Sequence, residues 1–314
     1  MRLPRNPFVW GITLVLAAGI VPGYATAQAI CSAPHSSPTL AQSGSLRTLP
    51  KGGRWLQLSA YGQRATRFFD PNGNRQPFLA GSEFDTRSLF LTGAIGVRSG
   101  FELWAQVPVH DLDVESAGGD SRASGFGDVR IATRLGSELV GLDLPISLRL
   151  GAKIPGSDFP VDATVLPLTE GQIDWEVSLE SGLRLRDSST FIVGWIGYRW
   201  REENEEAARE PGDELFASVA IGGTQNRFTW QVTGDALWGG VPLAQGFRLP
   251  GDKRRFVQIL PTVGMSLGPG QLEATAQFPV WGQNLPAGIG VSMGYRLNWG
   301  LTPSTTDLRD FFGG

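Results

Sequence analysis

The feature that most constrains this chain is a two-residue alternation of apolar and polar side chains, recurring in segments of about ten residues. Successive side chains of a β-strand point to opposite faces, so the alternation predicts strands with one apolar face. In the clearest segment, 289–299, that face carries Ile289, Val291, Met293, Tyr295, Leu297 and Trp299. No apolar stretch after residue 27 is long enough for a transmembrane helix. Membrane residence would therefore require a barrel, since only helices and closed barrels satisfy every backbone polar group in lipid.

About twelve such segments follow one another along the chain. They cover residues 54–65, 88–98, 101–109, 128–135, 146–154, 174–185, 190–200, 213–223, 227–238, 255–267, 272–280 and 289–299. We therefore predict an all-β protein, a single transmembrane antiparallel β-barrel of about 12 strands and of the outer-membrane type.

The connections between the segments alternate in length, as periplasmic turns and longer outer loops do in such barrels. Short turns are expected near 98–100, 136–143, 186–190, 223–227 and 267–270, and longer polar loops at about 66–84, 110–125, 155–170, 201–212 and 239–254. A secreted β-sandwich would also alternate apolar and polar residues. The mixed charge along the polar faces and the unbroken rhythm of the connections favour the barrel.

The N-terminus has the order of a secretory signal peptide. Arg2 and Arg5 precede the apolar run 8–21, and the small-residue site Ala25–Ala27 follows it. We predict four regions: a signal peptide at 1–27, an unstructured periplasmic arm at 28–52, the barrel at 53–299 and a C-terminal tail at 300–314. The predicted location is the bacterial outer membrane, after export and removal of the signal peptide.

The formal net charge of −3 gives no basic bias toward nucleic acid, and the two histidines limit metal and acid–base chemistry. We expect no cofactor, no metal and no enzymatic activity. An outer-membrane hydrolase would place serine and histidine near the rim, and His110 is followed by Asp111, Ser121 and Ser124. Sequence proximity does not establish the required hydrogen bonds, so this alternative is disfavoured. Residues 70–74 have oxygen ligands at calcium-like spacing, but a tight turn is favoured.

The polar faces of the middle segments are rich in charge. The residues that we expect to line the lumen are Asp128, Arg130, Arg134, Arg149, Lys153, Asp174, Glu176, Glu180, Arg184 and Trp104. Charges inside a barrel must be paired or hydrated, because an unpaired buried charge is very costly. The same residues could line a narrow pore or form a salt-bridge lattice that closes the barrel.

Three patches of the sequence carry a resemblance to known proteins. The first is GFGDV at 125–129, and the second is LRLGAKIPG at 148–156 followed by GQID at 171–174. The third is GYRW at 197–200 ahead of PGDE at 211–214. With these patches the chain resembles a family of outer-membrane barrels that is named for the MetA pathway of phenol degradation and often described as transporters. The resemblance spans roughly residues 85–299 and implies a barrel associated with uptake of small, often aromatic, compounds, without catalytic residues.

Together these observations predict an outer-membrane channel or transporter for small solutes, including aromatic or hydrophobic compounds. The alternatives are a closed barrel with a structural or surface-interaction role and, less favoured, the hydrolase. The expected partners are outer-membrane lipid, lipopolysaccharide, the barrel-assembly machinery and a small-molecule solute, with no nucleic acid.

Overall fold

The computed structural model describes residues 47–78, 81–116, 119–160, 162, 165–185 and 189–300. The predicted signal peptide, residues 28–46 of the predicted arm and residues 301–314 of the tail lie outside this part. Among the described residues, no helix is long and apolar enough to cross a membrane.

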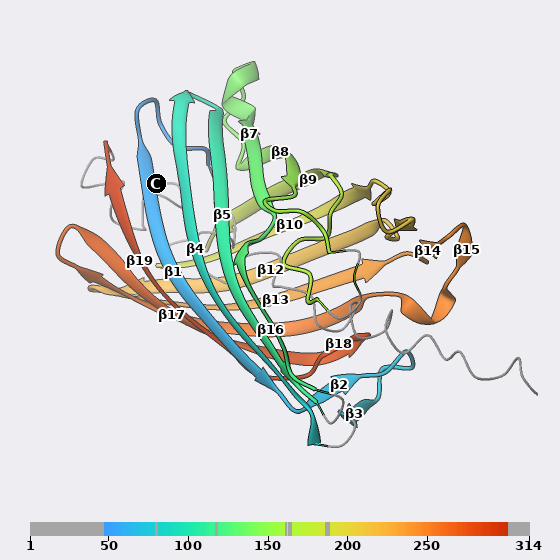
Figure 1. The fold of residues 1–314 in the computed structure, drawn as a ribbon. Coiled ribbons are helices and arrows are strands. Elements are labelled where there is room, and N and C mark those ends of the chain that lie inside the picture. The colour runs from blue at the N-terminus through green and yellow to red at the C-terminus, as the bar shows by residue number, and fades with distance from the viewer. Residues whose placement is uncertain are drawn as a thin grey trace, which may run out of the picture.

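Twelve antiparallel strands close into a barrel, which confirms the predicted fold (Figure 1). In chain order they are β1 (Arg54–Ala65), β4 (Glu83–Arg98), β5 (Phe101–Glu115), β6 (Ser121–Phe126) continued by β7 (Val129–Gly136), β8 (Ile146–Ile154), β9 (Asp174–Arg184), β10 (Thr190–Arg201), β12 (Glu214–Gln225), β13 (Phe228–Gly239), β16 (Arg255–Leu267), β17 (Gly270–Gln283) and β19 (Gly290–Trp299). The first and last strands pair from Arg54↔Trp299 to Gln63↔Gly290, so the sheet has no free edge.

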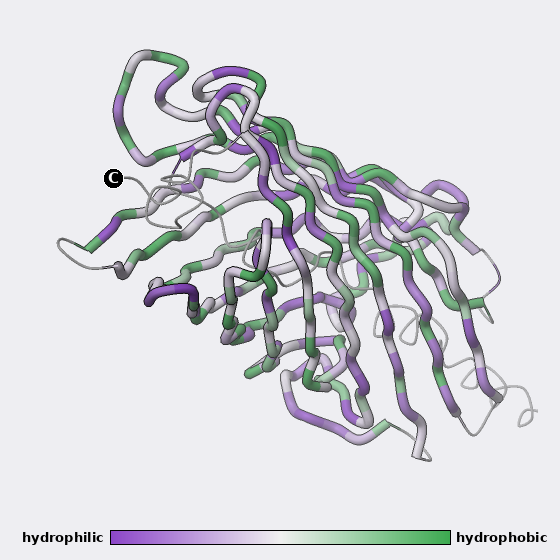
Figure 2. Tube along the Cα trace, turned by 90° about the vertical axis from the view of Figure 1, so that its left-hand side faces the viewer, coloured by the Kyte–Doolittle hydropathy of each residue, from purple (hydrophilic) through white to green (hydrophobic). Residues whose placement is uncertain are grey.

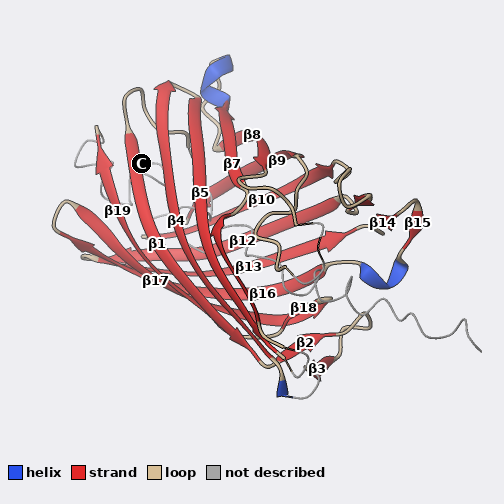
Figure 3. Cartoon of the chain, in the orientation of Figure 1, coloured by secondary structure: helices blue, strands red, loops and turns tan. Residues whose placement is uncertain are grey.

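The two ends of the barrel differ. At one end, which we call the turn end, short connections join the strands; Asn226–Arg227 between β12 and β13 is one, and Asn226 adopts a left-handed φ of 55°. At the other, the loop end, longer connections carry two small sheets (Figure 3). One contains β2 (Arg67–Phe69), β3 (Arg75–Pro77) and β18 (Leu285–Pro286), and the other β11 (Arg209–Glu210), β14 (Leu243–Ala244) and β15 (Phe247–Arg248). Short 3-10 helices occupy Ser137–Val140 and Pro250–Asp252.

The barrel is inverted relative to a soluble protein, with apolar side chains outside and polar side chains inside. On β1, Leu58 is 57% exposed on the outer surface, whereas the neighbouring Gln57 is 1% exposed and points inward. Figure 2 shows the same alternation of hydrophobic and hydrophilic residues along many strands. Period-two side-chain placement thus gives an apolar surface suited to lipid and a polar interior.

The expectation of a loop at 110–125 was wrong. β5 continues to Glu115 and pairs with β6 from Val109↔Phe126 to Val114↔Ser121. The outward side of this extension is polar, and Arg122 Nη2 lies 2.9 Å from Asp111 Oδ2 across the two strands. A strand that extends beyond the hydrocarbon region no longer needs apolar outward residues. The outward residues of 110–125 are therefore polar, and the composition of this segment resembles that of a loop.

β6 and β7 form one strand interrupted by a bulge. Val109 pairs with Phe126 and Gln106 with Arg130, so this strand advances four residues while its partner advances three. The extra residue lies at Gly127–Asp128, and a Cβ atom on Gly127 would lie 2.3 Å from the His110 ring. Bulges redirect side chains and often occur beside functional sites.

The end of the predicted unstructured arm is in fact packed against the barrel. Leu49 is buried in a cluster with Trp55, Ala94 and Trp104 at the turn end. Its backbone N–H donates a hydrogen bond to Glu102 Oε2 at 2.9 Å. Residues 47–52 therefore belong to the ordered structure, because Leu49 gains an apolar pocket that the surrounding polar residues of the arm did not indicate.

Candidate functional site

The interior of the barrel has a charged wall, formed by the inward-facing ionisable residues of β7, β8, β9, β10 and β12. They are Arg130, Arg134, Arg149, Lys153, Asp174, Glu176, Glu180, Arg199, Arg201 and Glu214. Each strand pairs with the next in register, so period-two placement stacks these side chains in adjoining rows. Seven of the ten residues that we expected in the lumen lie on this wall.

The charged wall begins near the turn end. The Arg134 side chain lies 2.7 Å from Glu180 and 3.2 Å from Glu102 of β5. Arg149 lies 3.7 Å from Glu180, and its guanidinium stacks over the Trp104 ring at 4.4 Å from the centroid. These groups are arranged so that each buried charge has an opposite charge or an aromatic face beside it.

The middle of the wall is a chain of alternating charges. Arg130 and Arg199 both contact the Glu176 carboxylate, each at 2.6 Å. Arg199 also reaches Glu214 at 2.5 Å, which connects β7, β9, β10 and β12 through side chains alone. Glu214 is fully buried, with 0% of its surface exposed.

Near the loop end, residues 165–173 of the connection between β8 and β9 bend into the barrel and contribute Glu170. The Glu170 carboxylate contacts Lys153, lies 2.5 Å from Arg201 and lies 3.1 Å from Arg254, which precedes β16. Lys153 also lies 2.8 Å from Asp174 and 3.3 Å from Asp128. One loop acid, Glu170, thus joins cations from two strands, β8 and β10, and from a second loop.

Asp128 fixes the position of this loop. Its carboxylate accepts a hydrogen bond from the Thr169 hydroxyl and from the backbone N–H of Glu170, the latter at 3.3 Å to each oxygen. The bulge at Gly127–Asp128 brings this side chain to the loop. We had placed Asp128 in the lumen but had expected the 155–170 loop outside, so the contact between them was missed.

The remaining expected residues have different surroundings. Trp104 is buried at the turn end against Leu49 and Arg149. Arg184 is half-buried on β9 and forms no ion pair with any residue that the structure describes. Glu170, Arg199, Arg201, Glu214 and Arg254 are site residues that we did not predict. For Arg199 and Glu214 the signal was present in the predicted segments 190–200 and 213–223, and Arg201 follows the first of these directly. Glu170 and Arg254 lie in loops without periodicity.

The opposite side of the interior is a neutral wall, formed by inward-facing residues of β1, β4, β13, β16, β17 and β19. Its side chains are mainly Gln, Thr and Ser, including Gln57, Ser59, Thr92, Gln231, Thr233, Gln258, Thr262, Thr275 and Ser292. Thr262 and Thr275 hydroxyls lie 2.9 Å apart, and Gln57 Nε2 donates to Glu273 Oε2 at 3.0 Å. The Gln57–Glu273 hydrogen bond crosses β19 at Gly294. A Cβ atom on Gly294 would lie 3.0 Å from Gln57 Nε2, so the absence of a side chain there leaves room for this bond.

The residues considered for hydrolase chemistry are not brought together. His110 points inward and its Nδ1 lies 2.7 Å from Ser88 Oγ, with both residues buried. Asp111 is on the opposite face of β5 and pairs with Arg122, while Ser124 lies across from Asp111. Adjacent strand residues face opposite sides, so Asp111 cannot orient His110.

Residues 70–74 form the tight turn that was favoured over a calcium site. The Asp70 carboxylate accepts hydrogen bonds at 2.8 Å from the backbone N–H groups of Asn74 and Asn72. The bond from Asn74 is the main cause that holds the Asp70 pKa below its ordinary value. Among the described residues, no group of three or more His, Cys, Asp or Glu side chains is placed to hold a metal ion.

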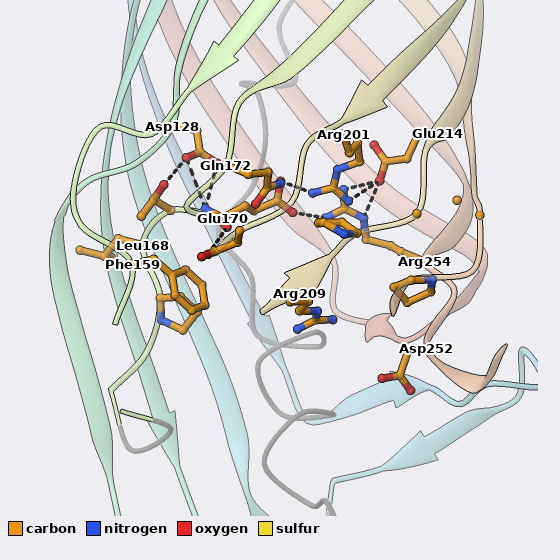
Figure 4. A pocket seen from close by; sticks show the side chains of 18 residues that line it. Asp128, Phe159, Leu168, Glu170, Gln172, Arg201, Arg209, Glu214, Asp252 and Arg254 are labelled. Carbon is orange, nitrogen blue, oxygen red and sulfur yellow. Dashed lines mark hydrogen bonds and ion pairs between the residues drawn. The ribbon is translucent and has the colours of Figure 1, made fainter. Parts of the chain in front are cut away.

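A cavity of about 90 Å³ lies on the loop side of Glu170 (Figure 4). Its charged lining includes Asp128, Glu170, Arg201, Arg209, Glu214, Asp252 and Arg254, and its apolar lining includes Phe159, Pro167, Leu168, Pro211 and Pro242. Loops 155–173, 202–213 and 240–254 contribute these residues together with the ends of β10, β12 and β13 and the bulge between β6 and β7.

Comparisons with known proteins agree with this architecture. An outer membrane channel from Pseudomonas putida F1 superimposes with a TM-score of 0.66 at 16% identity, covering 82% of this chain and 98% of that one. The beta domain of the Bordetella autotransporter BrkA gives 0.46 at 14% identity (79% and 99% coverage), and the toluene transporter TodX of P. putida gives 0.44 at 9% (80% and 91%). No curated protein matches this sequence.

The first of these likenesses shows a shared outer-membrane barrel fold, and the other two are weaker. The family model described as "Putative MetA-pathway of phenol degradation" matches residues 69–295, which is well over half of the chain and contains all three patches that carried the resemblance. The chain therefore belongs to the family of the MetA pathway of phenol degradation.

Proposed function

We propose that this barrel is an outer-membrane channel that passes small solutes, including aromatic compounds. The observation that carries the proposal is which strands and loops the described ion pairs of the charged wall join. The ion pairs of the charged wall run between strands at most two apart or join the wall to Asp128, Glu170 and Arg254. None that the structure describes reaches the neutral wall, whose own ion pair is Arg296–Glu273 at 3.7 Å. A lattice that closed the barrel would instead link the charged wall to the neutral wall.

The size of the barrel supports a narrow passage. Eight strands enclose a space that side chains fill, and sixteen or more leave a wide aqueous channel. Twelve strands lie between these limits, so inward side chains and loop 155–173 decide how wide the passage is. The polar lining on both walls would allow water and small solutes to enter.

The surroundings of the channel follow from its outer surface. The exposed apolar side chains of the strands would contact outer-membrane lipid, and the loop end would face lipopolysaccharide. Insertion would require the barrel-assembly machinery, and removal of the signal peptide after Ala27 stays a prediction. Recovery of the protein in the soluble periplasmic fraction would contradict this location.

The direct test is conductance of the purified protein in planar lipid bilayers. We expect discrete steps in current. Because three cations hold Glu170 inside the barrel, Glu170→Gln should weaken that anchor and increase the conductance of each step. Glu203→Gln, which changes an exposed acid in the neighbouring loop, should leave the steps unchanged. Silence from both the native protein and Glu170→Gln would support a closed structural barrel instead.

A further inference from the structure

We propose that the cavity beside Glu170 is a binding site for a small aromatic carboxylate, such as a benzoate, with Arg209 as its anion-binding group. Passage of the bound ligand through the barrel rests on the proposed channel function. The binding itself does not depend on it. Figure 4 shows Arg209 among the lining residues, between Phe159 on one side and Asp252 on the other.

Arg209 differs from the other two arginines of the cavity. Arg201 is paired with Glu170, Asp174 and Glu214, and Arg254 is paired with Glu170 and Glu214. These two guanidinium groups are therefore already neutralised. The half-buried Arg209 has no acid within ion-pair distance among the described residues, and Asp252 attracts it only from farther away.

The main chain holds Arg209 in place without using its side chain. The backbone N–H of Arg209 donates to Asn204 O at 3.1 Å, and Asn204 N–H donates to Arg209 O at 2.8 Å. Arg209 also pairs with Ala244 of β14. A guanidinium on a fixed backbone presents a planar set of donors that matches the two oxygens of a carboxylate.

The apolar part of the cavity fits a ring. Phe159 and Leu168 come from loop 155–173, and Pro167, Pro211 and Pro242 add rigid apolar surface. An apolar cavity of about 150 Å³ holds benzene, so a cavity of about 90 Å³ accepts at most one ring after a small displacement of Phe159.

A buried acceptor in the lining gives independent support for a ligand. Gln172 is 3% exposed, and its Nε2 donates to Asp174 Oδ1 at 3.0 Å. This bond fixes the orientation of the amide, because a carboxylate can only accept. Gln172 Oε1 is left without a hydrogen-bond partner among the described residues, a costly state. The ring hydroxyl of a hydroxybenzoate, or a water beside a benzoate, would supply the donor, since a carboxylate alone can only accept.

The proposal is tested by calorimetric titration of the detergent-purified full-length protein with four probes. Benzoate carries ring and negative charge, acetate the charge alone, benzyl alcohol the ring alone, and benzylammonium the ring with positive charge. We expect benzoate to bind more tightly than the other three. Arg209→Gln should weaken benzoate binding by about tenfold, the loss of one charge-assisted contact, and leave benzyl alcohol unchanged.

Two further variants locate the ligand. Arg248→Gln is the matched control, because Arg248 is an exposed arginine of β15 in the same small sheet. It should bind benzoate like the native protein. Phe159→Ala should weaken benzoate but not acetate. Equal binding of benzoate to native protein and Arg209→Gln, or tighter binding of benzylammonium, would overturn the proposal. These titrations do not depend on current, so their failure is distinct from failure of the channel function.

Discussion

The charged wall and the neutral wall belong to one closed sheet with one outward pattern, yet their interiors differ. Both have a continuous ladder of backbone pairs and exposed apolar side chains such as Leu150 on β8 and Val263 on β16. Inside, one wall carries alternating arginines and acids, and the other carries mainly amides and hydroxyls, with the single described ion pair Arg296–Glu273. The outward apolar side chains and the backbone pairing between strands therefore determine the barrel. The inward residues can differ from wall to wall, and they determine what passes through it.

The two walls also differ in what a single substitution costs. A charge that loses its partner in a confined interior keeps its desolvation penalty, whereas a neutral hydrogen bond contributes only about 1 kcal/mol. We therefore expect the charged wall to be more sensitive than the neutral wall to the loss of one partner.

The largest loss of stability should come from Glu214→Gln. Glu214 is fully buried and contacts Arg199, Arg201 and Arg254, so the substitution leaves three cations undercompensated. We expect the free energy of unfolding in urea to fall by about 3–5 kcal/mol. Glu203→Gln, in an exposed position, should have no measurable effect. A loss below about 1 kcal/mol for Glu214→Gln would remove the energetic distinction between the walls.

A substitution on the outer surface tests the pattern that the walls share. Leu150 is 40% exposed on the outside of β8, and an arginine there should cost about 2–4 kcal/mol if it lies near the membrane midplane. Gly151→Ser faces the interior and should cost less, although its Cβ would lie 3.1 Å from Ile131 O. The measurement is urea unfolding in lipid vesicles. Equal losses would mean that the inward and outward faces of β8 are assigned the wrong way round.

The neutral wall should yield the smallest effect. Thr262→Val removes the hydroxyl that lies 2.9 Å from Thr275 and keeps the shape of the side chain. We expect the unfolding free energy to fall by about 1 kcal/mol. The double variant with Thr275→Val should recover part of that loss, because no hydroxyl is then left unpaired. A loss as large as that of Glu214→Gln would show that the neutral wall is equally constrained.

Much of the barrel could be predicted from the sequence, because strand periodicity reports directly which face is outside. The predicted segments 146–154 and 255–267 coincide with β8 and β16. What could not be predicted lies where that period is absent or broken. Glu170 and Arg254 come from loops, and the extra residue at Gly127–Asp128 is visible only in the pairing with β5. The inward bend of loop 155–173 depends on contacts between residues distant in the chain.

The central claim is that the charged wall lines the conduction path, and the reversal potential in a salt gradient tests it most directly. Arg149→Gln combined with Lys153→Gln should shift the potential toward cation preference, and Asp174→Asn combined with Glu176→Gln should shift it the other way. Charges in a confined lumen are screened less than surface charges, so both shifts should be measurable. Thr262→Val should cause no shift. If channels form but neither charged pair moves the reversal potential, the charged wall does not line the path and the claim is contradicted.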